Sequence, residues 1–341
     1  MKLLKLIYQV ALFSTLSSAA TVVDYTGHGE AKKFIDMMVN EEKFCPDELH
    51  TLFSNVTLQQ RSLKFYAHPK KTARHSKKKK KQYGSWSRYE KKLLNPERID
   101  KGVAFMLKHQ DTLMRAYKTY GIPAEYITAI IGVESYYGAY TGKHPVFDTL
   151  CTLAFEENRR NAFFTKELRE FLKMTKREAL NPRELKGSYA GAIGLGQFMP
   201  SNFEKLGVDF NHDGKVRISE PEDAIGSIAN YFKQSGWKKN VPVATRVSYK
   251  GQRFNKLKTG YLHKYSRNRL KDIYPKDKTF NYKDKVSLIK LERVNYDELW
   301  YGTKNFYVIT RYNHSSYYAM AVHQLAQKIK ESYNKQHLAM K

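Results

Sequence analysis

The sequence predicts an α+β fold that is predominantly α-helical, with an N-terminal helical section and a small β-containing insert. Three observations lead to this class. Apolar residues recur three and four residues apart through most of the chain, which is the spacing of a helix face. Residues 241–311 instead alternate β-branched and aromatic residues with polar ones. Finally, 341 residues with 41% hydrophobic content can bury a large core.

The first twenty residues have the features of a signal peptide. Two lysines precede an apolar run from Leu6 to Leu16, and small residues follow it. The run is too short to span a bilayer, and no Cys follows it that could take a lipid. We therefore expect cleavage near Ala19 or Ala20 and a soluble exported protein.

Helical spacing then continues from residue 21 to residue 240. Residues 21–85 contain the helices "AKKFIDMMVNEEKF" and "PDELHTLFSNV", followed by a lysine-rich loop. In the core, 86–240, "NPERIDKGVAFMLKHQDTLMRAYKTYG" predicts one long helix that begins at Asn95 and Pro96 and ends at Gly121. Three more helices are predicted in "PAEYITAIIGVESYYG", "NAFFTKELREFLKMTKREAL" and "EPEDAIGSIANYFKQSGW".

The insert, 241–311, is the part that predicts strands. "VPVATRVSYKG", "KVSLIKLERV" and "NFYVITRY" are each rich in β-branched and aromatic residues. A final helix in "SSYYAMAVHQLAQKIKESY", within 312–335, is expected to return to the core. No internal repeat is visible.

The chain is strongly basic, with a formal net charge of +27. Such a charge favours a polyanionic partner. Nucleic acid is the usual partner of a basic protein, but the export signal argues against it, whereas anionic polymers of a cell envelope fit both observations. The run Lys77–Lys81 is either a solvated linker or a patch that binds such polymers.

The only two cysteines are Cys45 and Cys151. In an oxidising compartment they could form a disulfide. Cys151 lies in the apolar stretch "TLCTLAF", however, and a small core residue is the alternative interpretation. The sequence leaves both interpretations open.

Glu134 is the strongest candidate for a catalytic group. Ile127, Ile130 and Ile131 precede it by seven, four and three residues, so its carboxyl group lies on the apolar face of a helix. Desolvation raises the pKa of such a carboxyl group, which suits a general acid, although a structural ion pair is the alternative. In "GVESYYG", Gly132 is expected to leave one side open, and the two tyrosines suit the flat faces of sugars.

The second candidate segment is "GSYAGAIGLGQFMPSNFEK", residues 187–205. Its small residues allow close approach of a backbone, but the glycine order is not a dinucleotide fingerprint and no predicted strand precedes it. Ser201 and Glu204 match a capping box. Gln197 has no such explanation, and an amide with donor and acceptor capacity suits an N-acetyl sugar.

The stretch "DFNHDGKVRISE" matches the loop of an EF-hand, with Gly214 at the turn position. An Asx-rich surface turn is the alternative. Because the loop is single and the chain is predicted to be exported, a structural calcium ion is expected rather than a sensor. The predicted ligands are Asp209, Asn211, Asp213, the carbonyl of Lys215, and Glu220.

Several of these segments resemble a known family. "IIGVESYYG", "LKGSYAGAIGLGQFMPSNF", "DAIGSIANYFKQSGW" and "FYVITRYNHSSYYAMAVHQLAQ" are similar to segments of the membrane-bound lytic murein transglycosylase B family. The resemblance runs from about residue 30 to residue 330. It implies a lysozyme-like catalytic core, a monomer, a substrate of peptidoglycan glycan strands, and an EF-hand-like loop that supports the calcium prediction. It does not extend to a lipid-attachment Cys, which this chain lacks.

The resemblance also implies roles for particular residues. Glu134 corresponds to the family's single acid/base, and the substrate-contacting positions fall on Tyr89, Arg159, Arg160, Ser188, Gln197, Tyr231, Tyr312, Asn313 and Tyr318. The alternatives remain open: Tyr231, Tyr312 and Tyr318 as core aromatics, the arginines as ion-pair partners, and Asn313 as a helix cap.

The implied reaction opens the bond between N-acetylmuramic acid and N-acetylglucosamine without water and leaves a 1,6-anhydro ring. A lysozyme-type hydrolase that uses the same acid is the nearest alternative. A non-catalytic wall-binding protein and a basic nucleic-acid binder are alternatives of other classes, and the export signal weighs against the last.

Overall fold

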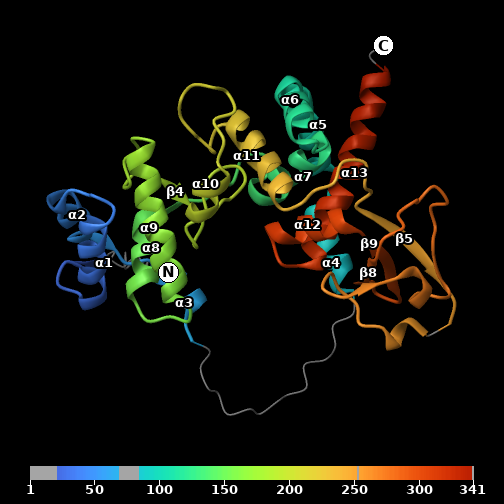
Figure 1. The fold of residues 1–341 in the computed structure, drawn as a ribbon, viewed down its shortest axis with the longest axis horizontal. Coiled ribbons are helices and arrows are strands. Elements are labelled where there is room, and N and C mark those ends of the chain that lie inside the picture. Colours follow the sequence, from blue (N-terminus) through green and yellow to red (C-terminus); the bar gives the residue numbers. More distant parts are fainter. Residues whose placement is uncertain (1–20, 69–83, 252, 340–341) are drawn as a thin grey trace, which may run out of the picture. The chain divides into compact units, whose positions relative to one another are not determined.

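The structure is a computed structural model that describes residues 21–68, 84–251 and 253–339 (Figure 1). The predicted signal peptide, 1–20, and the lysine run, 77–81, lie outside the described residues. The chain divides into two compact units, Met1–Gln60 and Arg61–Lys341. In the part of the chain that is described, no helix has the length and apolarity needed to cross a membrane.

The first unit contains the two helices predicted for it. They are α1 (Gly29–Asn40) and α2 (Pro46–Phe53), the second beginning at its proline as expected. Two short strands, β1 (Val22–Val23) and β2 (Val56–Thr57), pair antiparallel. Apolar side chains of both helices, such as Phe34 and Phe53, are buried and in ring contact.

The second unit holds most of the helices, which confirms the predicted mainly helical α+β class and its lysozyme-like core. They are α3 (Gln60–Tyr66), α4 (Ser85–Leu93), α5 (Pro96–Lys108), α6 (Gln110–Tyr120), α7 (Ala124–Ser135), α8 (Val146–Phe155), α9 (Asn161–Arg177), α10 (Pro200–Leu206), α11 (Pro221–Gln234), α12 (Lys304–Tyr312) and α13 (Ser316–Ala339). A two-stranded ribbon joins β3 (His144–Pro145) to β4 (Lys186–Gly187).

The single long helix predicted over 95–121 is wrong. The chain breaks at His109, which ends α5 and precedes α6 with non-helical dihedrals (φ −114°, ψ 27°). The break lets α5 pack against α13 and α7 while α6 packs against α11. The predicted ends are correct: the Asn95 side chain accepts from the Arg98 amide, and Gly121 ends α6 with φ 73°.

The insert folds as a five-stranded antiparallel sheet in the order β6-β8-β9-β5-β7 (Figure 1). Its strands are β5 (Ala244–Tyr249), β6 (Lys264–Tyr265), β7 (Ile273–Pro275), β8 (Val286–Glu292) and β9 (Asp297–Gly302). Two short 3-10 helices, Arg253–Lys256 and Arg267–Arg269, lie between strands. Residues such as Leu288 and Tyr301 give the sheet a core of its own.

One predicted strand of the insert is a helix. "NFYVITRY" forms α12, because the Thr303 side chain accepts from the Asn305 amide at the helix N-terminus. The Asn305 side chain also bonds the backbone of Lys238 and Val241, which holds the start of the helix in place. The third long strand is "DELWYG", β9, which pairs with both β8 and β5.

Helix α7 lies at the centre of this unit. It packs against α5, α6, α11 and α13, and nearly all of its residues are buried. Ile127, Ile130 and Ile131 are fully buried, and each contributes roughly 1.5–3 kcal/mol of hydrophobic stabilisation. A helix buried on all sides is a rigid support for the residues at its two ends.

Candidate active site

Glu134 stands in the last turn of α7 with its side chain partly exposed. The hydroxyl of Tyr318, on α13, donates to Glu134 Oε1 at 2.5 Å. Burial raises the pKa of the Glu134 carboxyl to about 7, and the hydrogen bond from Tyr318 offsets part of that rise. The group therefore changes its protonation state near neutral pH.

Tyrosines from four elements surround this carboxyl group. The rings of Tyr318 and Tyr312 stack at 6.5 Å and 10°, and Tyr231 on α11 lies 4.7 Å from Tyr312. Burial, and then the charge of Glu134, raises the pKa of both Tyr312 and Tyr318. The same two causes raise the pKa of Tyr89 on α4. The phenols thus stay neutral hydrogen-bond donors.

Two of these hydroxyls are already bound to the backbone. Tyr312 donates to the carbonyl of Gly196 at 2.5 Å, and Tyr231 donates to the carbonyl of Arg311 at 2.5 Å. A Cβ on Gly196 would lie 2.8 Å from the Tyr312 hydroxyl, so this glycine is needed for the close approach. Tyr231 is buried and Tyr312 half-buried. Tyr312 therefore also holds the loop before α10 in place, and Tyr231 ties α11 to α12.

Gln197 lies in this loop in the left-handed region (φ 49°). Its Nε2 donates to the carbonyls of Thr141 and Gly194, both at 2.9 Å. The N–H groups of Gln197 that were expected to donate to an N-acetyl sugar thus already bond these two carbonyls. Its Oε1 remains as an acceptor. Ser188 begins the same loop, where its Oγ accepts from the amides of Ala190 and Ala192.

The expected opening beside Gly132 is wrong. A Cβ on Gly132 would lie 2.5 Å from the Tyr137 hydroxyl, so the tyrosine fills that space. The same hydroxyl donates to the carbonyl of Arg98 at 2.8 Å, and Tyr137 is therefore a packing residue. Tyr136 is half-buried, with Lys101 over its ring at 4.3 Å.

The predicted capping box is also wrong. Helix α10 begins at Pro200 with no side-chain cap. Instead, the amide and hydroxyl of Ser201 both donate to the buried carboxylate of Glu167, at 2.9 and 2.7 Å. Glu204 pairs with Arg177 at 2.6 Å. These bonds tie α10 to α9.

The remaining three predicted contacts are exposed. Arg159 and Arg160 precede α9, where Arg160 lies over the ring of Phe163 at 3.9 Å and Arg159 over that of Tyr66 at 5.8 Å. Neither arginine pairs with a carboxylate among the described residues. Asn313 follows Tyr312 as the C-cap of α12.

The loop 209–220 turns its oxygen atoms inward. Oδ1 of Asp209 and Oδ1 of Asn211 both accept from the Asp213 amide at 3.1 Å, while Asp213 Oδ1 accepts from the Lys215 amide. Such hard oxygen donors suit calcium. The guanidinium of Arg217 lies between two of the predicted ligands, since it pairs with Asp213 and is 3.8 Å from Glu220 Oε1. Accordingly, no three His, Cys, Asp or Glu side chains gather at a metal-binding distance within the described ranges.

Sequence reasoning missed Asp223, which anchors this loop. Asp223 is fully buried, and its carboxylate accepts from the amides of Phe210, Asn211 and Arg217. In the sequence it is one more acidic residue in the first turn of α11. Its burial, which the sequence alone does not show, distinguishes it.

The two cysteines are both free thiols, Cys45 exposed and Cys151 buried. The open question from the sequence is thus answered for Cys151, which is a small core residue of α8. Burial raises the pKa of its thiol well above the usual range.

Comparison with known proteins places this geometry in a family. The Transglycosylase SLT domain family matches residues 27–327. The chain belongs to this family. It is 41% identical over 308 residues to the membrane-bound lytic murein transglycosylase B of Escherichia coli, covering 90% of this chain and 84% of that protein. The chain is thus an enzyme of the lytic transglycosylase class.

Solved structures of relatives have the same fold. The E. coli lytic transglycosylase SLT35 in complex with calcium superposes with a TM-score of 0.84 at 38% identity, covering 92% of this chain and 96% of that one. SltB3 of Pseudomonas aeruginosa, solved in complex with NAG-anhNAM-pentapeptide, superposes with a TM-score of 0.74 at 25% identity, covering 89% and 80%.

Proposed function

We propose that this lytic transglycosylase cleaves the β-1,4 bond between N-acetylmuramic acid and N-acetylglucosamine in peptidoglycan, with Glu134 as its single acid/base. The observation that carries the proposal is the carboxyl group of the half-buried Glu134, which accepts from Tyr318 and whose pKa burial raises to about 7. Burial raises this pKa, and the hydrogen bond from Tyr318 lowers it in part.

The Tyr318 hydrogen bond indicates which oxygen carries the proton. Because Oε1 accepts from the phenol, the acidic proton resides on Oε2. Glu134 gives this proton to the glycosidic oxygen as the bond to the muramic C1 breaks, and the acetamido oxygen of the substrate stabilises C1. The resulting carboxylate removes the proton of the C6 hydroxyl, and O6 closes on C1. The acid is restored and no water is consumed.

The other candidate residues would hold the glycan on either side of this carboxyl group. Tyr89 and Tyr312 lie close enough to Glu134 for its charge to raise the pKa of their phenols. Gln197 offers its free Oε1 to an acetamido N–H. The remaining proposed contacts are Arg159, Arg160, Ser188, Tyr231 and Asn313. The relative crystallised with NAG-anhNAM-pentapeptide supports the proposed product.

A murein digest tests the reaction. Purified sacculi incubated with the wild type should release anhydro-muropeptides, and Glu134→Gln should release them about 10²–10⁴-fold more slowly, the usual contribution of a general acid. Glu157→Gln, a change at an exposed residue, is the matched control and should act like the wild type. A product one water heavier would identify a lysozyme-type hydrolase instead.

We also propose that calcium binds the loop 209–220 and acts as a structural ion. The inward oxygens of Asp209, Asn211 and Asp213 support this, as does the SLT35 structure with calcium. The Lys215 carbonyl and Glu220 would complete the set. Bound calcium would fix the segment between the Gln197 loop and α11, with little direct effect on Glu134.

Calcium should therefore raise thermal stability more than turnover. At a concentration about a hundredfold above Kd, binding to the folded state adds about 2.7 kcal/mol. Scanning calorimetry with calcium, with magnesium and with chelator measures this, and Asp213→Ala should abolish the calcium shift. An unchanged Tm under all three conditions would mean that the loop binds no ion.

The remaining proposals concern location and partners. The E. coli relative is named as membrane-bound, whereas this chain is proposed to be exported to the periplasm as a soluble monomer. Its charge of +27 supports additional electrostatic contact with anionic envelope polymers. Retention on sacculi that weakens as salt rises would support that contact.

A further inference from the structure

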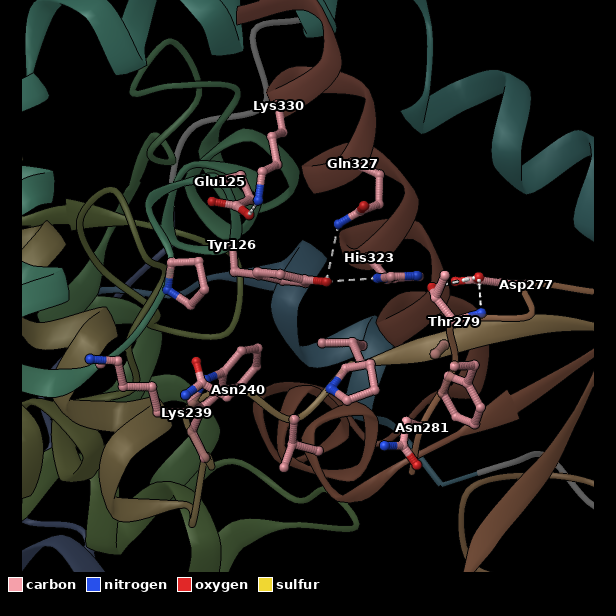
Figure 2. A pocket seen from close by; sticks show the side chains of 18 of the residues that line it. Glu125, Tyr126, Lys239, Asn240, Asp277, Thr279, Asn281, His323, Gln327 and Lys330 are labelled. Carbon is pink, nitrogen blue, oxygen red and sulfur yellow. Dashed lines mark hydrogen bonds and ion pairs between the residues drawn. The ribbon is translucent and has the colours of Figure 1, made fainter. Parts of the chain in front are cut away.

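A pocket lies at the N-terminal end of α7, where Glu125 and Tyr126 line it (Figure 2). Glu134 is in the last turn of the same helix. Its volume of about 550 Å³ is in the range of small-molecule sites. Residues from α6, α7 and α13 line it, together with the segments 237–244 and 277–281. Tyr126, which lines the pocket, lies about 12 Å along the helix axis from Glu134, at 1.5 Å per residue. The two sites are therefore separate.

His323 supplies a buried hydrogen-bond donor to this pocket. The side chain is only 6% exposed, and its Nδ1 lies 2.8 Å from the Tyr126 hydroxyl. Gln327 Nε2 donates to the same hydroxyl oxygen at 3.4 Å, so the hydroxyl hydrogen is directed to Nδ1. Burial lowers the pKa of His323 to about 4, which keeps the ring neutral with its proton on Nε2. No described residue bonds this Nε2, which points away from Tyr126 (Figure 2).

The charged groups of the pocket are equal in number and opposite in sign, and one pair of them forms a salt bridge. Glu125 pairs with Lys330 at 2.9 Å, and Asp277 Oδ1 accepts from the amide and hydroxyl of Thr279. Lys239 lies over the ring of Tyr117 at 5.0 Å. The formal charges of the lining, Glu125, Asp277, Lys239 and Lys330, sum to zero, so the pocket offers an ionic ligand no net counter-charge. The pocket suits a neutral ligand.

Several neutral polar groups, by contrast, are free. The side-chain amides of Asn240 and Asn281 are exposed and have no hydrogen-bond partner among the residues described. Each can donate and accept, as vicinal hydroxyl groups require. Trp237, Val243 and Phe280 add an apolar wall. An imidazole N–H for a carbonyl, amides for hydroxyls and an apolar wall for a methyl group match the parts of an N-acetylated sugar.

We propose that this pocket binds a neutral N-acetylhexosamine unit of a glycan strand, as a second and non-catalytic site of the enzyme. The proposal rests on the proposed function for the source of the ligand. A glycan held here would keep the enzyme on the wall while Glu134 acts elsewhere on the strand network.

A titration with N,N′-diacetylchitobiose tests the site directly. This sugar lacks the muramic bond, so the wild-type chain can be used without turnover. In protein labelled with ¹⁵N at asparagine and glutamine side chains, the amide signals of Asn240 and Asn281 should shift. The signal of Asn295, an exposed residue in the turn between β8 and β9, should not. Unmoved Asn240 and Asn281 signals up to the solubility limit would overturn the proposal.

Variants give the second measurement. Read from the side-chain amide signal of Gln327, which lines the same pocket, the double change Asn240→Gly and Asn281→Ala should raise the Kd for chitobiose about tenfold, the loss expected for two hydrogen bonds. Asn295→Ala should not change this Kd. His323→Asn retains an acceptor for the Tyr126 hydroxyl but loses the imidazole N–H, so it should weaken sugar binding. The Tm of this variant is measured as a control for folding. Signals that respond to an acidic tetrapeptide and not to chitobiose would contradict the sugar class.

These outcomes are separable from the proposed function. Release of anhydro-muropeptides by the same preparation reports on Glu134 alone. If the digest succeeds and Asn240 and Asn281 do not respond to the sugar, only the second site is wrong. If the signals respond and no anhydro product forms, the reaction is wrong and the sugar site stands.

Discussion

The two ends of α7 carry the same arrangement with opposite consequences. At the C-terminal end, Tyr318 on α13 bonds Glu134 at 2.5 Å. At the N-terminal end, the helix's own Tyr126 bonds His323 on α13 at 2.8 Å. In each case a buried tyrosine holds a titratable group between the same two helices. Burial raises the pKa of the acid to about 7 and lowers that of the base to about 4.

The difference follows from one physical rule. Desolvation disfavours whichever form is charged, so it keeps a carboxyl group protonated and an imidazole unprotonated. The result at Glu134 is a proton that can be transferred near neutral pH. The result at His323 is a fixed, neutral donor. We therefore propose that similar packing produces a reactive group at one end of the helix and a binding group at the other.

The largest expected effect is on the pH dependence of turnover. Glu134 must be protonated when the substrate binds, so kcat should fall as pH rises through about 7. With that pKa, the rate at pH 9 should be about a hundredfold below the rate at pH 6. His323 has already lost its proton throughout this range and should add no second limb. Initial rates of anhydro-muropeptide release at saturating sacculi measure the profile. A flat profile would mean that Glu134 is not the acid.

Tyr318→Phe should produce the next largest effect. Its hydrogen bond lowers the pKa of Glu134 and orients the carboxyl group, so removing it should move the alkaline limb to higher pH. The rate at pH 6 should fall about tenfold, because the acid is less well positioned.

Tyr317→Phe is the matched control for that change. Its hydroxyl bonds Ser85 and the Glu292 amide, and no bond links it to Glu134. In this variant, the alkaline limb of the pH profile should lie at the same pH as in the wild type. If both variants shift the limb equally, the tyrosine cluster acts through general packing and not through the bond to Glu134.

Hydrophobic periodicity predicted most of the helices. It failed where contacts with residues distant in the sequence determine whether a segment is a helix or a strand. The Glu134 helix was predictable because its apolar stripe lies in twelve consecutive residues. "NFYVITRY" has strand composition, yet Thr303 and Asn305 make it a helix through bonds that include residues more than sixty positions away. The apolar run "VFDTLCTLAF" is helix α8, buried on all sides, and so shows no periodicity that could separate a helix from a strand.

The candidate site shows the same limit. The helical spacing of the isoleucines before Glu134 indicated that its carboxyl group lies on an apolar face, and the family resemblance indicated the tyrosines around it. One hydrogen bond of Gln197 depends on Thr141, which is 56 positions away in the sequence. The space beside Gly132 is filled because the Tyr137 side chain packs against it. The pocket at the N-terminal end of α7 combines five separate segments and carries no sequence motif. Such features follow from tertiary packing and are visible only in the fold.

Tyr126→Phe should have the smallest effect. It changes only the N-terminal end of α7 and is expected to lower stability and leave turnover unchanged. The change leaves His323 Nδ1 buried without a donor, which costs about 1–2 kcal/mol of unfolding free energy. Denaturant unfolding at pH 7 measures this loss. The pH profile of turnover should stay that of the wild type, since Glu134 lies about 12 Å further along the helix. A shift of the alkaline limb of the pH profile in this variant would show that the two ends are coupled through α7. The two ends would then not act as separate catalytic and binding sites.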